Sequence, residues 1–151
     1  MLSFTYTYKE TNLAKLAELA IRRPEEINLT YLHGLGILQA SCAGDTLEIH
    51  LPLIDFVLMM TGITDDLSAG KNASFEDTES DAHLNFVLSG KDVTISADFQ
   101  DWSCRIPLDS LRTIIAKLAQ DVTDDLLRKV PAIANVPEYI TARKQIEKYK
   151  P

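Results

Sequence analysis

The sequence predicts a single α+β domain over residues 1–151, with an antiparallel sheet of about five to six strands and helices packed mainly on one face. Three observations support this fold class. Several segments alternate apolar and polar residues, as half-buried strands do, and are separated by glycine-containing turns. Other segments repeat their apolar residues at helical spacing. The length of 151 residues is typical of one domain, and such a core needs no metal or disulfide for support.

The N-terminal segment predicts a strand followed by a helix. Apolar and polar residues alternate from Leu2 to Tyr8, which indicates a half-buried strand. Helical spacing of apolar residues then runs from Leu13 to Ile21, and Pro24 ends the helix because it cannot continue the backbone hydrogen bonding.

A hairpin is predicted over residues 37–51, with Gly44-Asp45 as its two-residue turn. In this register Cys42 faces Leu47, and the apolar residues of both strands lie on one side of the hairpin.

Two prolines are expected to open helices after strands. Pro52 begins a helix that carries Phe56, and Pro107 begins the longest helix, which ends before Pro131. A final, basic helix is expected to begin near Pro137.

Between these helices the sequence predicts a three-stranded meander with one solvent-exposed face. Its strands are expected at residues 84–88, 93–99 and 102–106. Tight hairpins would place Phe86 opposite Ile95, Ala97 opposite Cys104, and Ile95 opposite Ile106. Phe99 would then point to the apolar face with the other large side chains.

The two cysteines, Cys42 and Cys104, each lie in an apolar, strand-like run. We expect both to be free thiols that pack as small hydrophobes. No dense cysteine framework and no signal-peptide pattern is present, and the most apolar window, residues 51–60, is interrupted by Pro52 and Asp55. The sequence therefore predicts a cytoplasmic protein without membrane association.

Negative charge is concentrated in the middle of the chain. Residues 61–101 contain two positive and nine negative side chains, a net of −7, which equals the charge of the whole chain. Residues 1–60 carry −3 and residues 102–151 carry +3, so the two flanks cancel. We interpret the central segment as a docking surface for a basic protein, because complementary charge speeds association and rejects wrong partners.

The expected partner-binding residues are eight of the nine acidic side chains of this segment and one aromatic anchor. They are Asp65, Asp66, Glu76, Asp77, Glu79, Asp81, Asp98, Asp101 and Trp102. The same negative charge is also explained by a solvated face that keeps the protein soluble. Trp102 lies within the apolar alternation of its segment, which favours a core position for it. The basic C-terminal helix could also fold back and neutralise part of the segment. Nucleic acid is not expected as a partner, because phosphate binding needs a basic patch.

Catalytic and metal-binding patterns are not found. His33, His50 and His83 lie far apart in the chain and match no metal-ligand spacing. The carboxylates from Glu76 to Asp81 lack the glycine and terminal glutamate of a calcium loop. We expect no cofactor and no metal, and a protein that is not an enzyme.

A resemblance to a known family rests on four short segments. These are residues 73–79 (ASFEDTE), Leu84-Asn85-Phe86, Asp92-Val93-Thr94-Ile95, and Pro107-Leu108 at the start of a long helix. Together they resemble the immunity proteins encoded beside bacterial polymorphic toxins, including those of contact-dependent inhibition systems. The resemblance implies a cytosolic, often acidic α+β protein that binds and blocks a cognate toxin domain, often a basic nuclease. It implies no catalytic residues.

Two other functions remain open from the sequence. One is a small ligand-binding domain or enzyme with a pocket between the sheet and the helices. The other is a subunit of a homo-oligomeric structural or adaptor protein, joined through an exposed sheet edge or the long helix.

Overall fold

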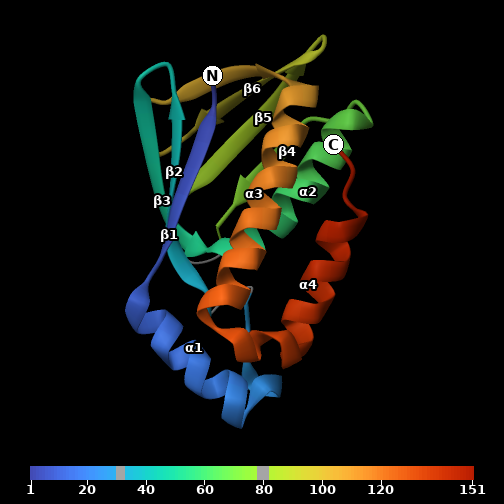
Figure 1. The fold of residues 1–151 in the computed structure, drawn as a ribbon. Helices are drawn as coiled ribbons and strands as arrows, with labels where there is room; N and C mark the ends of the chain where they lie inside the picture. Colours follow the sequence, from blue (N-terminus) through green and yellow to red (C-terminus); the bar gives the residue numbers. More distant parts are fainter. Residues whose placement is uncertain (30–32, 78–81) are drawn as a thin grey trace.

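The computed structural model describes residues 1–29, 33–77 and 82–151, and this part of the chain forms an α+β fold with four α-helices and two antiparallel sheets (Figure 1). In chain order the elements are β1 (Ser3–Tyr8), α1 (Glu10–Arg22), the 3₁₀ turn η1 (Pro24–Glu26), β2 (Leu35–Cys42), β3 (Asp45–Pro52), α2 (Leu53–Ser68), β4 (Ala73–Glu76), β5 (His83–Ser89), β6 (Asp92–Ala97), β7 (Ser103–Pro107), α3 (Leu108–Lys129), η2 (Pro131–Asn135) and α4 (Pro137–Lys148). The predicted α+β class and the four predicted helices are confirmed.

The strands form two sheets, so the expectation of one sheet with five to six strands is wrong. The order is β1-β2-β3 in one sheet and β4-β5-β6-β7 in the other, and all neighbours are antiparallel. The sequence reading missed β4, which has only four residues and one buried side chain, Phe75. So short a strand shows too little alternation to be recognised.

The core lies between the inner faces of the two sheets and α2. Phe56 of α2 joins them, because its ring makes edge-to-face contacts with Phe4 of β1, at 6.0 Å between ring centroids, and with Phe75 of β4, at 5.2 Å. Figure 1 shows α2 and α3 side by side, and α3 runs past β1. Pro52 and Pro107 are the last residues of β3 and β7, so α2 and α3 begin one residue later than predicted.

The β2–β3 hairpin has a different turn from the predicted one. Ala43 and Gly44 occupy the turn, both with positive φ (53° and 88°), as a type I′ turn requires. Cys42 therefore pairs with Asp45 rather than with Leu47. The shift is two residues, so the predicted apolar face is preserved.

The meander shows a similar shift between its second and third strands. Phe86 pairs with Ile95, as predicted, but Ile95 pairs with Cys104 instead of Ile106. The connection from β6 to β7 is longer than a tight turn, since the backbone N–H of Ala97 donates to the carbonyl of Trp102 across residues 98–101. Phe99 lies in this connection rather than in a strand and is 41% exposed.

The two cysteines form a disulfide, which corrects the expectation of two free thiols. Cys42 at the end of β2 and Cys104 in β7 have Cα atoms 5.9 Å apart and are bonded through their sulfur atoms. The bond links the three-stranded sheet to the four-stranded sheet. The alternation had placed both thiols on the core face, but it could not show that these two positions meet. Because disulfides persist mainly in oxidising compartments, cysteine usage no longer supports a cytoplasmic location.

Candidate functional site

The acidic segment of the sequence does not form one surface. Asp65 and Asp66 lie on α2, Glu76 ends β4, and Asp98 and Asp101 lie in the connection between β6 and β7. Asp77 directly follows β4, and the predicted residues Glu79 and Asp81 lie outside the described residues. The segment is therefore divided between a helix and one end of a sheet.

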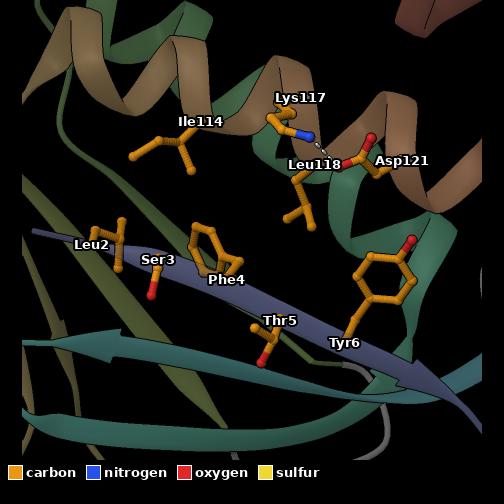
Figure 2. Close-up of a pocket in the computed structure, with 9 residues that line it drawn as sticks. All are labelled: Leu2, Ser3, Phe4, Thr5, Tyr6, Ile114, Lys117, Leu118 and Asp121. Atoms are coloured by element: carbon orange, nitrogen blue, oxygen red, sulfur yellow. Dashed lines mark hydrogen bonds and ion pairs between the residues drawn. The ribbon is translucent and has the colours of Figure 1, made fainter.

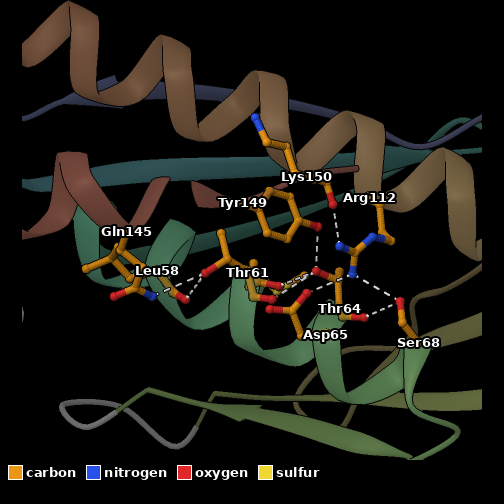
Figure 3. Close-up of polar contacts among 10 residues, drawn as sticks. Leu58, Thr61, Thr64, Asp65, Ser68, Arg112, Gln145, Tyr149 and Lys150 are labelled. Carbon is orange, nitrogen blue, oxygen red and sulfur yellow. Dashed lines mark hydrogen bonds and ion pairs between the residues drawn. The ribbon is translucent and has the colours of Figure 1, made fainter. Parts of the chain in front are cut away.

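The helical part is neutralised within the fold at Asp65. Arg112 reaches from α3 and donates from Nη1 to Asp65 Oδ1 and to Ser68 Oγ, both at 3.0 Å (Figure 3). The guanidinium carbon also lies 4.9 Å from the centre of the Tyr149 ring. The Arg112 side chain is only 14% exposed, whereas that of Asp65 is 64% exposed, so one partner of this contact is shielded from water. Asp65 is thus a solvent-exposed carboxylate that already has a cationic partner within the fold.

The basic C-terminal helix also engages the other helices. Arg143 of α4 donates to Asp124 of α3 at 2.5 Å, and the Tyr149 hydroxyl after α4 hydrogen-bonds Thr64 of α2. These contacts, like the hydrogen bond from Arg112 to the carbonyl of Lys150, hold the C-terminal segment against α2 and α3. In the described part of the chain the positive charge of α4 therefore does not reach the acidic residues of the four-stranded sheet.

The sheet part forms a cluster around a histidine that the sequence reading had not assigned to the site. His83 Nε2 lies 2.9 Å from Glu76 Oε1, and His83 Nδ1 lies 3.0 Å from Asp98 Oδ2. The backbone N–H of His83 also donates to Asp98 Oδ1 at 3.2 Å. The hydrogen bond with Glu76, together with the negative charges of Glu76 and Asp98, raises the pKa of His83 above its ordinary value of 6.5.

This cluster lies at one end of the outer face of the four-stranded sheet, which we call the polar sheet face. Its side chains alternate with core residues along the strands and are exposed or half-exposed: Ser74, Glu76, His83, Asn85, Val87, Thr94, Ser96, Ser103 and Arg105. At the other end Arg105 pairs with Asp92 at 2.9 Å. The excess negative charge is therefore confined to the end that carries Glu76, Asp98 and the adjacent Asp101.

The structure buries Trp102, which the sequence reading considered as the aromatic anchor. Its side chain is 4% exposed, and Nε1 donates to the carbonyl of Asp45 at 3.2 Å, so it packs between the two sheets. Phe99 is the exposed aromatic residue beside the acidic cluster, between Asp98 and Asp101 in the chain. The sequence signal for it was the polar Asp-Phe-Gln-Asp stretch, which is typical of a loop rather than of a strand.

A second set of carboxylates surrounds the start of α2. Burial, and then the negative charges of Asp77 and Glu138, raise the pKa of Asp55 to about 6. The Glu138 carboxylate accepts a hydrogen bond from the backbone N–H of Leu29. A shifted carboxyl pKa is a common feature of functional sites, but structural carboxylates show it as well. Among the described residues, no cluster of three or more potential ligands could hold a metal ion.

The space between the sheets and α2 is too small for a ligand. It measures about 10 Å³ and is lined by core residues such as Phe56, Met60 and Phe86. Ligand pockets usually measure about 300–1,000 Å³. The central space between the two sheets and α2 therefore gives no support to a ligand or substrate pocket there.

Comparisons with known proteins return no relatives: no family model, no curated protein and no solved structure matches the chain. In the described ranges no helix is both long and apolar enough to cross a membrane.

Proposed function

We propose that this chain is a non-enzymatic binding domain for a basic protein, and that it acts as an immunity protein that neutralises a toxin domain in the bacterial cytoplasm. The partner docks on the acidic end of the polar sheet face. The observation that carries the proposal is the cluster of Glu76, His83 and Asp98 on an otherwise polar face, while α2 packs on the other side of the sheet.

The chemistry of this face suits recognition of a cationic surface. Glu76 and Asp98 present carboxylates to solvent and share His83 between them, and Asp101 adds a further exposed charge. Phe99 supplies an exposed aromatic ring beside them, and interfaces are enriched in such anchors. The small hydroxyl and amide side chains over the rest of the face would let a flat partner surface approach closely.

The disulfide sets a condition on the cytoplasmic part of the proposal. Thiols are kept reduced in the cytosol, so Cys42 and Cys104 would be unlinked there. A disulfide contributes about 2–4 kcal/mol, whereas a domain is stabilised by about 5–15 kcal/mol in total. We therefore expect the reduced chain to stay folded and to bind.

The test uses the purified product of the gene that neighbours the gene for this chain, titrated against the chain at 50 and 300 mM NaCl, between which the Debye length falls from about 14 Å to about 6 Å. The double variant Glu76→Lys/Asp98→Lys should weaken binding by more than about tenfold, mainly through a slower association rate. Phe99→Ala should weaken it by about tenfold through a faster dissociation rate. Coexpression should protect cells from the partner, and the double variant should not.

Asp66→Lys is the matched control, because Asp66 belongs to the same acidic segment but lies on α2, away from the polar sheet face. It should change the affinity by less than about threefold, as expected for a distant surface charge. Equal losses for Asp66→Lys and the double variant would show that net charge, not this face, attracts the partner. Absence of any binding or protection would contradict the immunity assignment.

A further inference from the structure

The three-stranded sheet has a free edge at β1. The backbone N–H of Lys9 donates to the carbonyl of Leu35 at 3.0 Å, and the register continues from this pair to Ser3 opposite Ser41. Since hydrogen-bonded pairs alternate along antiparallel strands, the backbone groups of Phe4 and Tyr6 point away from β2. Among the described residues, no hydrogen bond uses the N–H or C=O of Phe4 or Tyr6 on that side.

A groove of about 480 Å³ lies along this edge and is closed on its far side by α3 (Figure 2). Phe4 and Tyr6 point from β1 toward α3, and Ile114 and Leu118 point from α3 toward β1. The rim carries Lys117 and Asp121, whose side chains pair with each other at 2.7 Å. The groove thus combines an unpaired strand edge with an apolar wall, and its volume is typical of a binding pocket.

We propose that this groove binds an extended segment of a partner protein, which adds to β1 as an antiparallel strand and carries a basic, then a polar, then an apolar residue opposite Tyr6, Thr5 and Phe4. This site is separate from the polar sheet face. Recognition by strand addition takes its affinity from main-chain hydrogen bonds and its specificity from alternate side chains. Antiparallel addition continues the pairing of the existing sheet.

The apolar and polar positions follow from the alternation of β1. Residues opposite Phe4 and Tyr6 point to the same side as those two rings, toward α3, while a residue opposite Thr5 points to the other side. The side chain opposite Phe4 meets Ile114 and Leu118 and is therefore apolar.

The basic position follows from charge complementarity at the Tyr6 end. Asp121 lines the groove at this end. Burial is the main reason why the pKa of Tyr6 is raised to about 12, and the negative charges of Asp125 and Asp121 add to it. Asp125 is compensated by both Arg128 and Lys129. Among the described residues Asp121 pairs with Lys117 alone, which is 77% exposed, and such surface pairs within a helix contribute only about 0.3–0.5 kcal/mol. A cationic side chain of the occupant can share the Asp121 carboxylate.

A second copy of this chain fits the groove less well than a single strand. The edge of β1 in that copy would be bounded by its own α3, so two helices would have to share one groove. A peptide segment brings no helix with it. The geometry therefore selects an extended segment rather than a homodimer.

The test uses a blocked hexapeptide with the order Ser-Lys-Thr-Val-Thr-Ser, which places lysine opposite Tyr6 and valine opposite Phe4. Titration into the ¹⁵N-labelled chain should shift the amide signals of β1 and of residues 114–121 of α3 in a saturable way. Hydrogen exchange of the Phe4 and Tyr6 amides should slow, because both become hydrogen-bonded.

Two methylated peptides separate strand addition from simple apolar contact. Methylating the valine nitrogen removes the donor to the Phe4 carbonyl and should weaken binding by about tenfold or more. Methylating the central threonine nitrogen, which faces away from β1, is the matched control and should change binding by less than about threefold. This comparison needs no protein variant.

The charge claim is tested with a peptide in which glutamate replaces lysine. It should bind about two- to fivefold more weakly, and Asp121→Asn should remove this difference while leaving the Phe4 and Tyr6 amides protected by both peptides. Equal binding of the two methylated peptides, saturable shifts confined to other surfaces, or no binding by any peptide would overturn the proposal. Protected Phe4 and Tyr6 amides in a dimer without peptide would overturn it in favour of a second copy.

Discussion

The two sheets of this protein expose different parts to solvent: one exposes a face and the other an edge. Both are antiparallel and both pack their inner faces around α2, where Phe56 contacts Phe4 of one sheet and Phe75 of the other. The four-stranded sheet presents an outer face with a charged end at Glu76 and Asp98. The three-stranded sheet instead presents an open edge at β1 beside α3.

This difference separates two modes of recognition in one small domain. A sheet face is recognised through side chains, so its affinity depends on charge and on salt. A sheet edge is recognised through main-chain groups, so most single side-chain changes affect it weakly. Changes at the link between the sheets should affect both surfaces, whereas changes within one sheet should affect one of them.

The largest effect is expected from breaking the Cys42–Cys104 bond, which links the two sheets across 62 residues. A chain-entropy argument for a loop of this size gives about 4 kcal/mol, and measured disulfides give about 2–4 kcal/mol. For a domain of this length the melting temperature should fall by roughly 5–15 °C. The measurement is thermal unfolding of the oxidised chain, the reduced chain and the Cys42→Ala/Cys104→Ala variant.

The reduced chain and the double alanine variant should agree, and both sheets should lose protection together in hydrogen exchange. An unchanged melting temperature after complete thiol release would show that packing around α2 alone couples the two sheets.

The next effect is expected from Gly36→Ala in β2. A Cβ atom at this position would lie 2.5 Å from Leu53 Cδ1 and 2.6 Å from the carbonyl oxygen of Thr7, and the latter is backbone that cannot easily move. Overpacking of this kind costs about 1–3 kcal/mol. Denaturant unfolding should show this loss, and hydrogen exchange should accelerate more in β1 than in β5.

Gly62→Ala is the matched control for Gly36→Ala. Gly62 lies on the exposed side of α2 and nothing stands within 4 Å of an added Cβ. Alanine there should stabilise the chain by about 0.5–1 kcal/mol, because it favours the helix. A loss at Gly62, or no loss at Gly36, would contradict the packing described for the two positions.

Much of the fold could be predicted because apolar spacing and proline positions specify helices and faces. The two register errors, at Gly44 and at Ile106, were both shifts of two residues, which leave the same side chains on the core face. Hydrophobic patterning cannot detect such shifts. The strand β4 was missed because it is short. The disulfide was missed because the contact of Cys42 with Cys104 depends on how the two sheets pack, which local patterns do not show.

The sequence named several residues of the candidate site but could not show their arrangement. Charge counting found Glu76 and Asp98, but only the pairing of β4 with β5 places His83 between them. Asp65 belongs to the same acidic segment, yet Arg112 of α3 compensates it, and no local pattern shows that contact. Trp102 lies in the core, as its place in the apolar alternation favoured, and so does not serve as an exposed anchor. Phe99 was expected on the apolar face but is exposed, because the strand ends before it.

A smaller effect is expected from Asp55→Asn in the first turn of α2. The pKa of Asp55 is raised to about 6 from 3.8, so the folded state holds the proton more tightly than the unfolded state. The stability that this provides is complete below about pH 4 and is lost as the pH rises through 6. Asparagine avoids the loss, so the variant should match the native chain near pH 4 and exceed it by about 1 kcal/mol at pH 7, after discounting for partial exposure.

Denaturant unfolding between pH 4 and pH 8 measures this difference. The dipole of α2 opposes it, since an ionised Asp55 in the first turn is favourable by about 0.3–1 kcal/mol. A variant that is less stable than the native chain at pH 7 would show that the helix dipole outweighs burial and the charges of Asp77 and Glu138.

The smallest effect concerns His83. It distinguishes most clearly between binding at the polar sheet face and binding at the β1 groove. The pKa of His83 should exceed 6.5 in NMR titration and should fall more in Glu76→Gln than in Asp98→Asn, because the Glu76 contact is the larger cause of the shift. The His33 signal, whose pKa is lowered by burial, is the internal control and should not respond. Any stability that the raised pKa of His83 supplies is present below pH 6.5 and is lost as the pH rises through the folded-state value.

Loss of that proton also leaves Glu76 and Asp98 without a cation between them, so the polar sheet face becomes more negative and should bind a basic partner more tightly at pH 8 than at pH 6. Peptide binding at the β1 groove should not change over this range, and a parallel pH dependence at both surfaces would show that they are not independent.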